Sequence, residues 1–137
     1  MKNNTGIIKQ IIGPVVDVYF EAEGGMPPLR NALVAKVGER KVTLEVAQHI
    51  GLGRVRAIAL QDTTGLSRGQ EIVDTGSAVT VPVGEQALGR LFNVIGEPID
   101  GKPAPEGAPR NSIHRDAPPF SEQSTKAEVF ELSLIHI

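Results

Sequence analysis

The stretch Gly6-Ile7-Ile8-Lys9-Gln10-Ile11-Ile12-Gly13-Pro14-Val15-Val16-Asp17-Val18-Tyr19-Phe20 decides the fold of this chain. In its second half Val16, Val18 and Phe20 share one face, and this two-residue period is typical of a strand that buries one side. Gly13-Pro14 interrupts the apolar run, because proline cannot donate to a ladder and glycine tolerates unusual dihedral angles. We therefore predict a bulge or corner at Gly13-Pro14, of the kind that a barrel needs in order to close.

Short strands separated by turn residues continue from this stretch to about position 83. Val42, Leu44 and Val46 form a second alternating apolar face within 42–47,. Further strands are predicted over 32–37, 54–60 and 71–73. Turn residues punctuate them at intervals of roughly a dozen positions, namely at 24–28, 38–40, 51–53 and 62–65. Many short strands without helical periodicity predict a mainly β fold, either a small antiparallel barrel or a sandwich.

The pattern changes after the apolar run 79–83, and we predict a domain boundary near 77–81. Residues 85–90 predict one or two helical turns, and 91–95 predict an apolar strand. The stretch 97–119 is rich in proline, which favours an extended segment packed over another surface.

The composition narrows the classes of function. Fourteen basic and sixteen acidic residues leave a net charge of −2, so the chain lacks the basic balance that repeated phosphate contacts with nucleic acid require. The absence of cysteine removes disulfides, thiolate zinc sites and cysteine nucleophiles, and it fits a reducing compartment. The start, Met1–Thr5, carries no signal or transit pattern, and no apolar run of about 18 residues follows. We expect no nucleic-acid partner and no direct insertion into a membrane.

One segment resembles a phosphate loop over six positions. Gly84-Glu85-Gln86-Ala87-Leu88-Gly89 has the two glycines, but Arg90-Leu91 stand where that loop has lysine and a serine or threonine,. An apolar leucine cannot ligate magnesium. A turn followed by a short structural helix is the favoured interpretation, and phosphate binding is the alternative.

A second segment matches the nucleophile elbow of α/β-hydrolases. Gly65-Leu66-Ser67-Arg68-Gly69 fits G-x-S-x-G, but the elbow requires a sharp turn from a buried strand into a helix,. Here a polar stretch precedes the motif and the strand-like 71–73 follows it. We interpret the segment as a polar hairpin loop in which Ser67 is inert.

The titratable side chains indicate no acid/base pair and no metal site. His49, His114 and His136 lie far apart, without carboxylates at metal-ligand spacing, which favours structural or exposed positions. The carboxylates of strands and turns are scattered and are predicted to be outward-facing residues or turn formers: Asp17, Glu45, Asp74 and Asp100. The sequon Asn3-Asn4-Thr5 follows no secretory signal, so we assign it no role. We predict no catalytic, cofactor-binding or metal-binding residue in this chain.

Several motifs, in order, resemble the catalytic β subunit of rotary F-type ATP synthases over about 6–131. They are Gly6–Val18, Leu44-Glu45-Val46-Ala47, Val55-Arg56-Ala57-Ile58-Ala59, Thr64-Gly65-Leu66-Ser67-Arg68-Gly69, Val81-Pro82-Val83-Gly84, Leu88-Gly89-Arg90, Asn93-Val94-Ile95-Gly96-Glu97-Pro98-Ile99-Asp100 and Ile113-His114-Arg115-Asp116-Ala117-Pro118. Non-catalytic α subunits share the Val-Pro-Val-Gly and Leu-Gly-Arg pieces. Ile12–Val18 and Asn93–Pro98 resemble β more closely.

The resemblance implies a domain organisation and a set of partners. Residues 1–79 would form a six-stranded antiparallel β-barrel that packs beside barrels of α subunits in a six-membered crown, and 80–131 would begin an α/β P-loop ATPase domain. The full-length family makes ATP from ADP and phosphate, with magnesium, driven by a transmembrane proton gradient and a rotating central γ stalk. It lies peripherally on the cytoplasmic face of the bacterial plasma membrane, or on the stromal or matrix face in organelles, and it meets the membrane only through the Fo sector.

In the family the phosphate loop and the other catalytic groups follow the position of Glu131. We therefore expect this chain alone to be inactive, to bind no cofactor and to contribute the barrel to ring assembly. Helix-forming residues return in 121–131, with Ser121 or Ser124 as the candidate N-cap,. The end, Leu132-Ser133-Leu134-Ile135-His136-Ile137, departs from the family pattern, and we expect 132–137 to be a non-native tail,.

Two other functions fit the same residues. A non-catalytic α-type or related ring-ATPase subunit would share the barrel and several of the motifs. An independent β-barrel binding module would share only the fold, and fold alone does not establish function.

Overall fold

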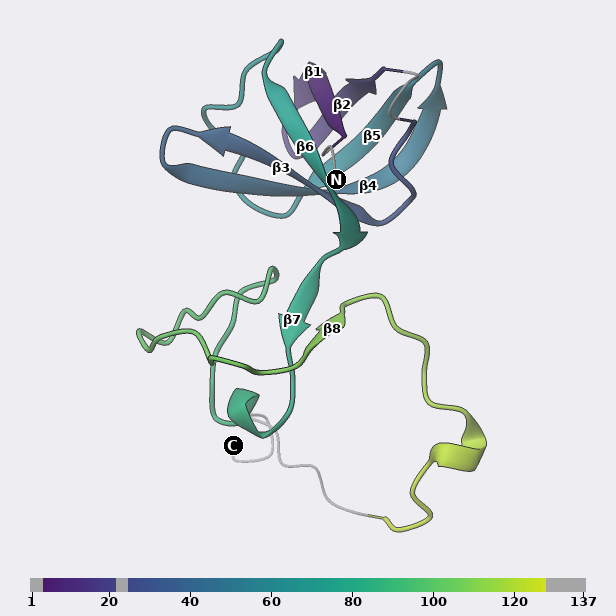
Figure 1. Ribbon diagram of the computed structural model, residues 1–137, viewed down its shortest axis with the longest axis vertical. Coiled ribbons are helices and arrows are strands. Elements are labelled where there is room, and N and C mark those ends of the chain that lie inside the picture. Colours follow the sequence, from purple (N-terminus) through teal and green to yellow (C-terminus); the bar gives the residue numbers. More distant parts are fainter. Residues whose placement is uncertain (1–3, 22–24, 128–137) are drawn as a thin grey trace.

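The computed structural model describes residues 4–21 and 25–127 of the chain and shows a closed six-stranded barrel (Figure 1). All neighbouring strands are antiparallel, and their order around the barrel is β1-β2-β5-β4-β3-β6. The strands are β1 Thr5–Ile12, β2 Val15–Phe20, β3 Asn31–Val37, β4 Arg40–Gly51, β5 Arg54–Ala59 and β6 Glu71–Ala78. The mainly β, six-stranded antiparallel barrel predicted from the sequence is therefore confirmed.

The barrel closes because β1 pairs on both of its edges. Ile7 lies opposite Tyr19 of β2 on one side and opposite Glu71 of β6 on the other. Since side chains alternate across a strand, every strand sends one apolar set inward. The resulting core consists of Ile8, Val16, Val18, Phe20, Leu33, Ala35, Val42, Leu44, Val46, Val55, Ala57 and Ile72.

Gly13-Pro14 forms a tight turn between β1 and β2, so the predicted bulge or corner at this point is wrong. Ile12 pairs with Val15 across the turn, and Gly13 has a φ of 56°. Glycine at the first central position is what two-residue turns with the twist of a hairpin demand. The bulge lies earlier, between Ile8 and Gln10 of β1, where the register with β2 shifts.

Strand β4 is longer than the predicted 42–47 and reaches Gly51. Its register with β5 shifts between Val46 and Gln48 and again between His49 and Gly51. Such irregularities bend a strand and increase its twist, which allows a long strand to follow the curve of a small barrel.

The connection 60–70 crosses the barrel and is not a hairpin loop, because its flanking strands β5 and β6 are not neighbours. It is attached to β1 by two backbone hydrogen bonds, from Gly69 N–H to Ile8 O at 2.8 Å and from Ile8 N–H to Gln70 O at 2.9 Å. Leu66 of this connection packs against the core. The polar composition of the loop was predicted correctly, and its topology was not.

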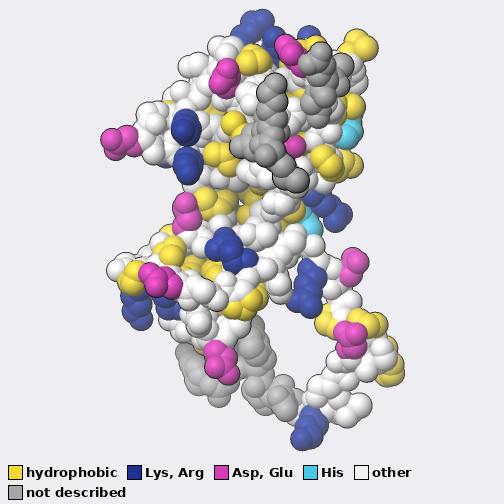
Figure 2. All heavy atoms as spheres, in the orientation of Figure 1, with side chains coloured by type: hydrophobic (Ala, Val, Ile, Leu, Met, Phe, Trp, Pro, Cys, Tyr) yellow, Lys and Arg dark blue, Asp and Glu magenta, His cyan; other side chains and the backbone are white. Residues whose placement is uncertain are grey.

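The chain beyond the barrel contains little regular structure. β7 (Thr80–Pro82) and β8 (Arg110–Ser112) form a two-stranded ribbon, and single 3-10 turns occupy η1 (Glu85–Ala87) and η2 (Phe120–Glu122) (Figure 1). On the face shown in Figure 2, hydrophobic side chains gather around the narrowing between this segment and the barrel. No helix among the described residues has both the length and the apolarity to span a membrane.

Two predicted elements beyond the barrel are wrong. The expected strand 91–95 is a loop whose described pairing is an isolated bridge between Phe92 and Pro98. The chain turns here because the side-chain oxygen of Asn93 accepts hydrogen bonds from the backbone amides of Ile95 and Glu97. Within the described residues, the predicted helix from 121 is only the 3-10 turn η2, preceded by Pro119. The rest of that prediction, 128–131, and the expected tail 132–137 lie outside the described residues.

Candidate functional site

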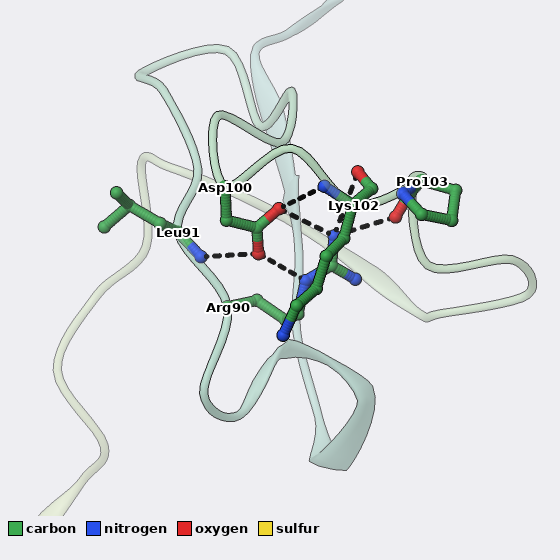
Figure 3. A network of polar contacts seen from close by, with 5 residues as sticks. All are labelled: Arg90, Leu91, Asp100, Lys102 and Pro103. Atoms are coloured by element: carbon green, nitrogen blue, oxygen red, sulfur yellow. Dashed lines mark hydrogen bonds and ion pairs between the residues drawn. The ribbon is translucent and has the colours of Figure 1, made fainter.

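Arg90, which occupies the lysine position of the phosphate-loop-like segment, is engaged by an ion pair (Figure 3). Its Nε lies 2.6 Å from Asp100 Oδ2 and its Nη2 lies 3.1 Å from Oδ1, a two-point contact between side chains that are each 14% exposed. The same Nη2 donates to the carbonyl oxygen of Pro103 at 2.7 Å. These hydrogen bonds fold the loop 90–103 back on itself.

Asp100 is held as a carboxylate by the groups that converge on it. The side-chain hydrogen bonds from Arg90, and then the amides of Lys102 and Leu91, hold the pKa of Asp100 far below its usual range,. The same contact raises the pKa of Arg90. Asp100 thus acts as the anchor of a loop, which is a structural role.

The backbone of the phosphate-loop-like segment is committed to its own turn. The amides of Ala87, Leu88 and Arg90 donate to the carbonyl oxygens of residues three positions earlier. In a phosphate loop such amides point at the ligand, and a long helix follows the loop. Here η1 spans three residues, and no phosphate-loop domain is present in the part of the chain that the structure describes.

The carboxylate of Asp17 lies on the outer face of β2, as the alternation predicts, yet the residue is only 8% exposed. Arg56 of β5 is its cross-strand neighbour and donates from Nε at 2.8 Å and from Nη2 at 2.9 Å. These hydrogen bonds from Arg56 lower the pKa of Asp17, and the charge of Arg54 acts in the same direction. The pair joins two strands of the barrel wall.

The described histidines make structural contacts. The Nε2 of His114 lies 2.6 Å from Oε2 of Glu45 on β4, a residue 69 positions away. The Nε2 of His49 lies 2.7 Å from the carbonyl oxygen of Pro27. His136 lies outside the described residues, and those that are described contain no group of three potential metal ligands.

Asp74 and Ser67, which the sequence analysis also considered, contact nearby backbone or side chains. Asp74 accepts from the amide side chain of Asn31 at 3.0 Å and from the Gly76 backbone at 2.9 Å. In the G-x-S-x-G segment the Ser67 amide donates to Gln70 Oε1 at 3.1 Å. The strand β6 follows that segment, so the helix on which a nucleophile elbow depends is missing there,.

Sequence reasoning missed a groove on the outer wall of the barrel. It has a volume of about 490 Å³ and brings together Lys9 and Gln10 of β1, Asp17 of β2, Arg54 of β5 and Arg68 of the crossing connection, with Ile11 beside them. We call it the cationic groove. Nothing in the sequence signals it, because its basic residues lie on separate segments of the chain and the net charge is negative.

The barrel coincides with a known domain. The model of the ATP synthase alpha/beta family, beta-barrel domain, matches residues 8–76, half of the chain. The match runs from within β1 to within β6, so it includes every strand of the barrel. Because the strands, their antiparallel closure and this match agree, the chain belongs to the ATP synthase alpha/beta family.

Proposed function

We propose that this chain is the barrel-bearing part of a catalytic β subunit of an F-type ATP synthase, and that its barrel assembles the ring with α subunits. The observation that carries the proposal is the family match over the closed barrel. Members of this family assemble in a ring, and a barrel that leaves no free sheet edge must do so through the outer faces of its strands.

The choice of β over α rests on motifs that the family match does not distinguish. Ile12–Val18 forms the β1–β2 hairpin, and Asn93–Pro98 forms the loop organised by the Asn93 side chain. Both segments resemble β subunits more than α subunits. Reading the gene beyond codon 131 tests the choice, because a β subunit should continue into a β-type phosphate loop.

The complete subunit would synthesise ATP from ADP and phosphate, using magnesium and the proton gradient, and would contact the γ stalk. It would lie peripherally at the cytoplasmic face of a bacterial membrane or at the corresponding organellar face. For the chain itself we propose no nucleotide binding, since Arg90 is engaged by Asp100 and the amides of the phosphate-loop-like turn are bonded internally.

Two measurements test the proposed function. Sedimentation of the chain mixed with purified α subunit should show a complex larger than either component alone. Calorimetric titration with Mg-ATP should show no binding tighter than about 1 mM. Failure to form any complex with α subunits would exclude the assembly role. ATP turnover by the chain would show that it contains a catalytic site, which would contradict the proposal.

A further inference from the structure

The cationic groove is assembled by long-range contacts. Arg54 is the cross-strand neighbour of Tyr19, and the ring of Tyr19 lies 5.4 Å from the ammonium of Lys9. Arg68 is brought to the groove by the two backbone bonds that attach its loop to Ile8, the neighbour of Lys9 in β1. β1, β5 and the connection 60–70 therefore each place one basic side chain at the groove.

The positive charge of the groove is not neutralised within the described residues. Asp17 is the only carboxylate among the described residues that lines it, and it accepts hydrogen bonds from Nε and Nη2 of Arg56. Lys9, Arg54 and Arg68 are exposed and form no ion pair among the described residues. Within the part of the chain that the structure describes, three unpaired cations thus line a groove whose carboxylate, Asp17, is already paired, on a chain whose net charge is −2. Such local excess favours an acidic partner.

A second groove lies on the neighbouring part of the barrel wall. It involves β3, β4 and β6, and β6 pairs with β1 of the cationic groove, where Glu71 lies opposite Ile7. It has a volume of about 730 Å³ and is lined by Val34, Lys36, Lys41, Gln70, Glu71 and Val73. The two grooves adjoin, because Arg68 lines the first and Gln70 of the same connection lines the second.

These two faces do not complement each other. If a second copy met this chain through either groove, Lys9, Arg54 and Arg68 would approach basic side chains again, since Lys36 and Lys41 line the second groove and Glu71 is its only carboxylate among the described residues. Like charges brought together disfavour such a contact. The neighbour at the cationic groove should therefore present an acidic surface, which neither groove of a second copy offers.

We propose that the cationic groove is a ring contact in which Arg54 and Arg68 receive acidic side chains of the neighbouring, non-identical barrel. This proposal rests on the proposed function, since the neighbour is a subunit of the same ring. The acidic side chains would lie against Lys9, Arg54 and Arg68 while Asp17 stays paired with Arg56.

The test compares two variants of equal charge in binding to purified α subunit, followed by calorimetry and sedimentation. Arg54→Glu/Arg68→Glu reverses the groove, and Lys102→Glu/Lys126→Glu makes the same change in net charge beyond the barrel. The groove variant should bind about tenfold or more weakly, whereas the control should stay within about twofold of the parent chain. The parent chain should also bind α subunit more weakly in about 300 mM salt than in about 50 mM salt. This loss of affinity should be larger for the parent than for the groove variant.

Several outcomes would overturn the proposal. Equal binding by the groove variant, with a far-ultraviolet spectrum and melting curve like those of the parent, would exclude the groove as a contact and leave the proposed function intact. Absence of binding by the parent chain would instead refute the proposed function. Calorimetric binding of inorganic phosphate that is lost in the groove variant, without any change in α binding, would identify a site for a small anion.

Discussion

The Nε2 atom of His114 lies 2.6 Å from Oε2 of Glu45, although the two residues are 69 positions apart. Glu45 belongs to β4 of the barrel, and His114 follows β8 of the next segment. Beside this contact the Ile113 amide donates to Val79 O at 3.0 Å, and Val79 is buried. The barrel therefore fixes the position of Ile113 and His114, near the end of the proline-rich stretch 97–119, and each of these contacts can be tested separately.

Removing the Glu45 carboxylate should loosen this attachment without unfolding the barrel. Both side chains are partly exposed, so Glu45→Ala should weaken the local attachment by about 1 kcal/mol. Hydrogen exchange of the Ile113 amide should accelerate by roughly fivefold. Glu39→Ala, in the turn between β3 and β4, is the control and should leave that amide unchanged. Unaltered exchange in Glu45→Ala would show that the Glu45–His114 contact does not stabilise this attachment.

Acid should weaken the barrel through Asp17. Because Arg56 lowers its pKa in the folded state, the stabilisation is complete above the usual carboxylate value of about 4 and is lost as pH falls through the folded value. Asp17→Asn should cost about 1 to 2 kcal/mol at neutral pH. Its melting temperature should also fall less steeply than that of the parent chain below about pH 5. Parallel curves for the two proteins would contradict this assignment.

Completing the phosphate-loop motif should not create a nucleotide site. Arg90→Lys/Leu91→Thr would supply the lysine and hydroxyl that the motif lacks. The amides of the turn would still be bonded to carbonyls within it, and the double change would also remove the two-point contact with Asp100. Calorimetry should show no Mg-ATP binding tighter than about 1 mM. Tighter binding would mean that residue identity, and not backbone geometry, prevents binding in this chain.

Two glycines of the β4–β5 hairpin should differ sharply in their tolerance of alanine. Both have positive φ, 90° at Gly51 and 74° at Gly53. A Cβ at Gly51 would meet nothing within 4 Å, whereas at Gly53 it would lie 2.6 Å from the carbonyl oxygen of Phe20. Gly51→Ala should therefore cost about 1 to 2 kcal/mol from backbone strain alone, and Gly53→Ala should cost clearly more. Chemical denaturation measures both, and equal losses would rule out the steric contribution.

Strand positions followed from local pattern, but connections did not. The alternation of Val16, Val18 and Phe20 predicts an inward face, and these residues are buried in the core. The connection 60–70 has the composition of a hairpin loop, and nothing local to it specifies that β5 and β6 are separated in the sheet. The apolar run 91–95 likewise predicts a strand, but the Asn93 side chain captures its amides. Contacts far along the chain decided the path of the connection, whereas a local contact between a side chain and the backbone overrode the apolar pattern of 91–95.

The sequence by itself determined the mainly β class, the approximate positions of five strands, the inward apolar faces within 15–20 and 42–47 and the family resemblance, because alternation, turn residues and motif order are local properties of a chain. Only the tertiary structure decided that Arg90 meets Asp100, that Glu45 meets His114, and that Lys9, Arg54 and Arg68 share one groove. Those relationships depend on strand order and on where a loop crosses the barrel. Both are set by the closure of the whole barrel, which no single stretch of the chain encodes.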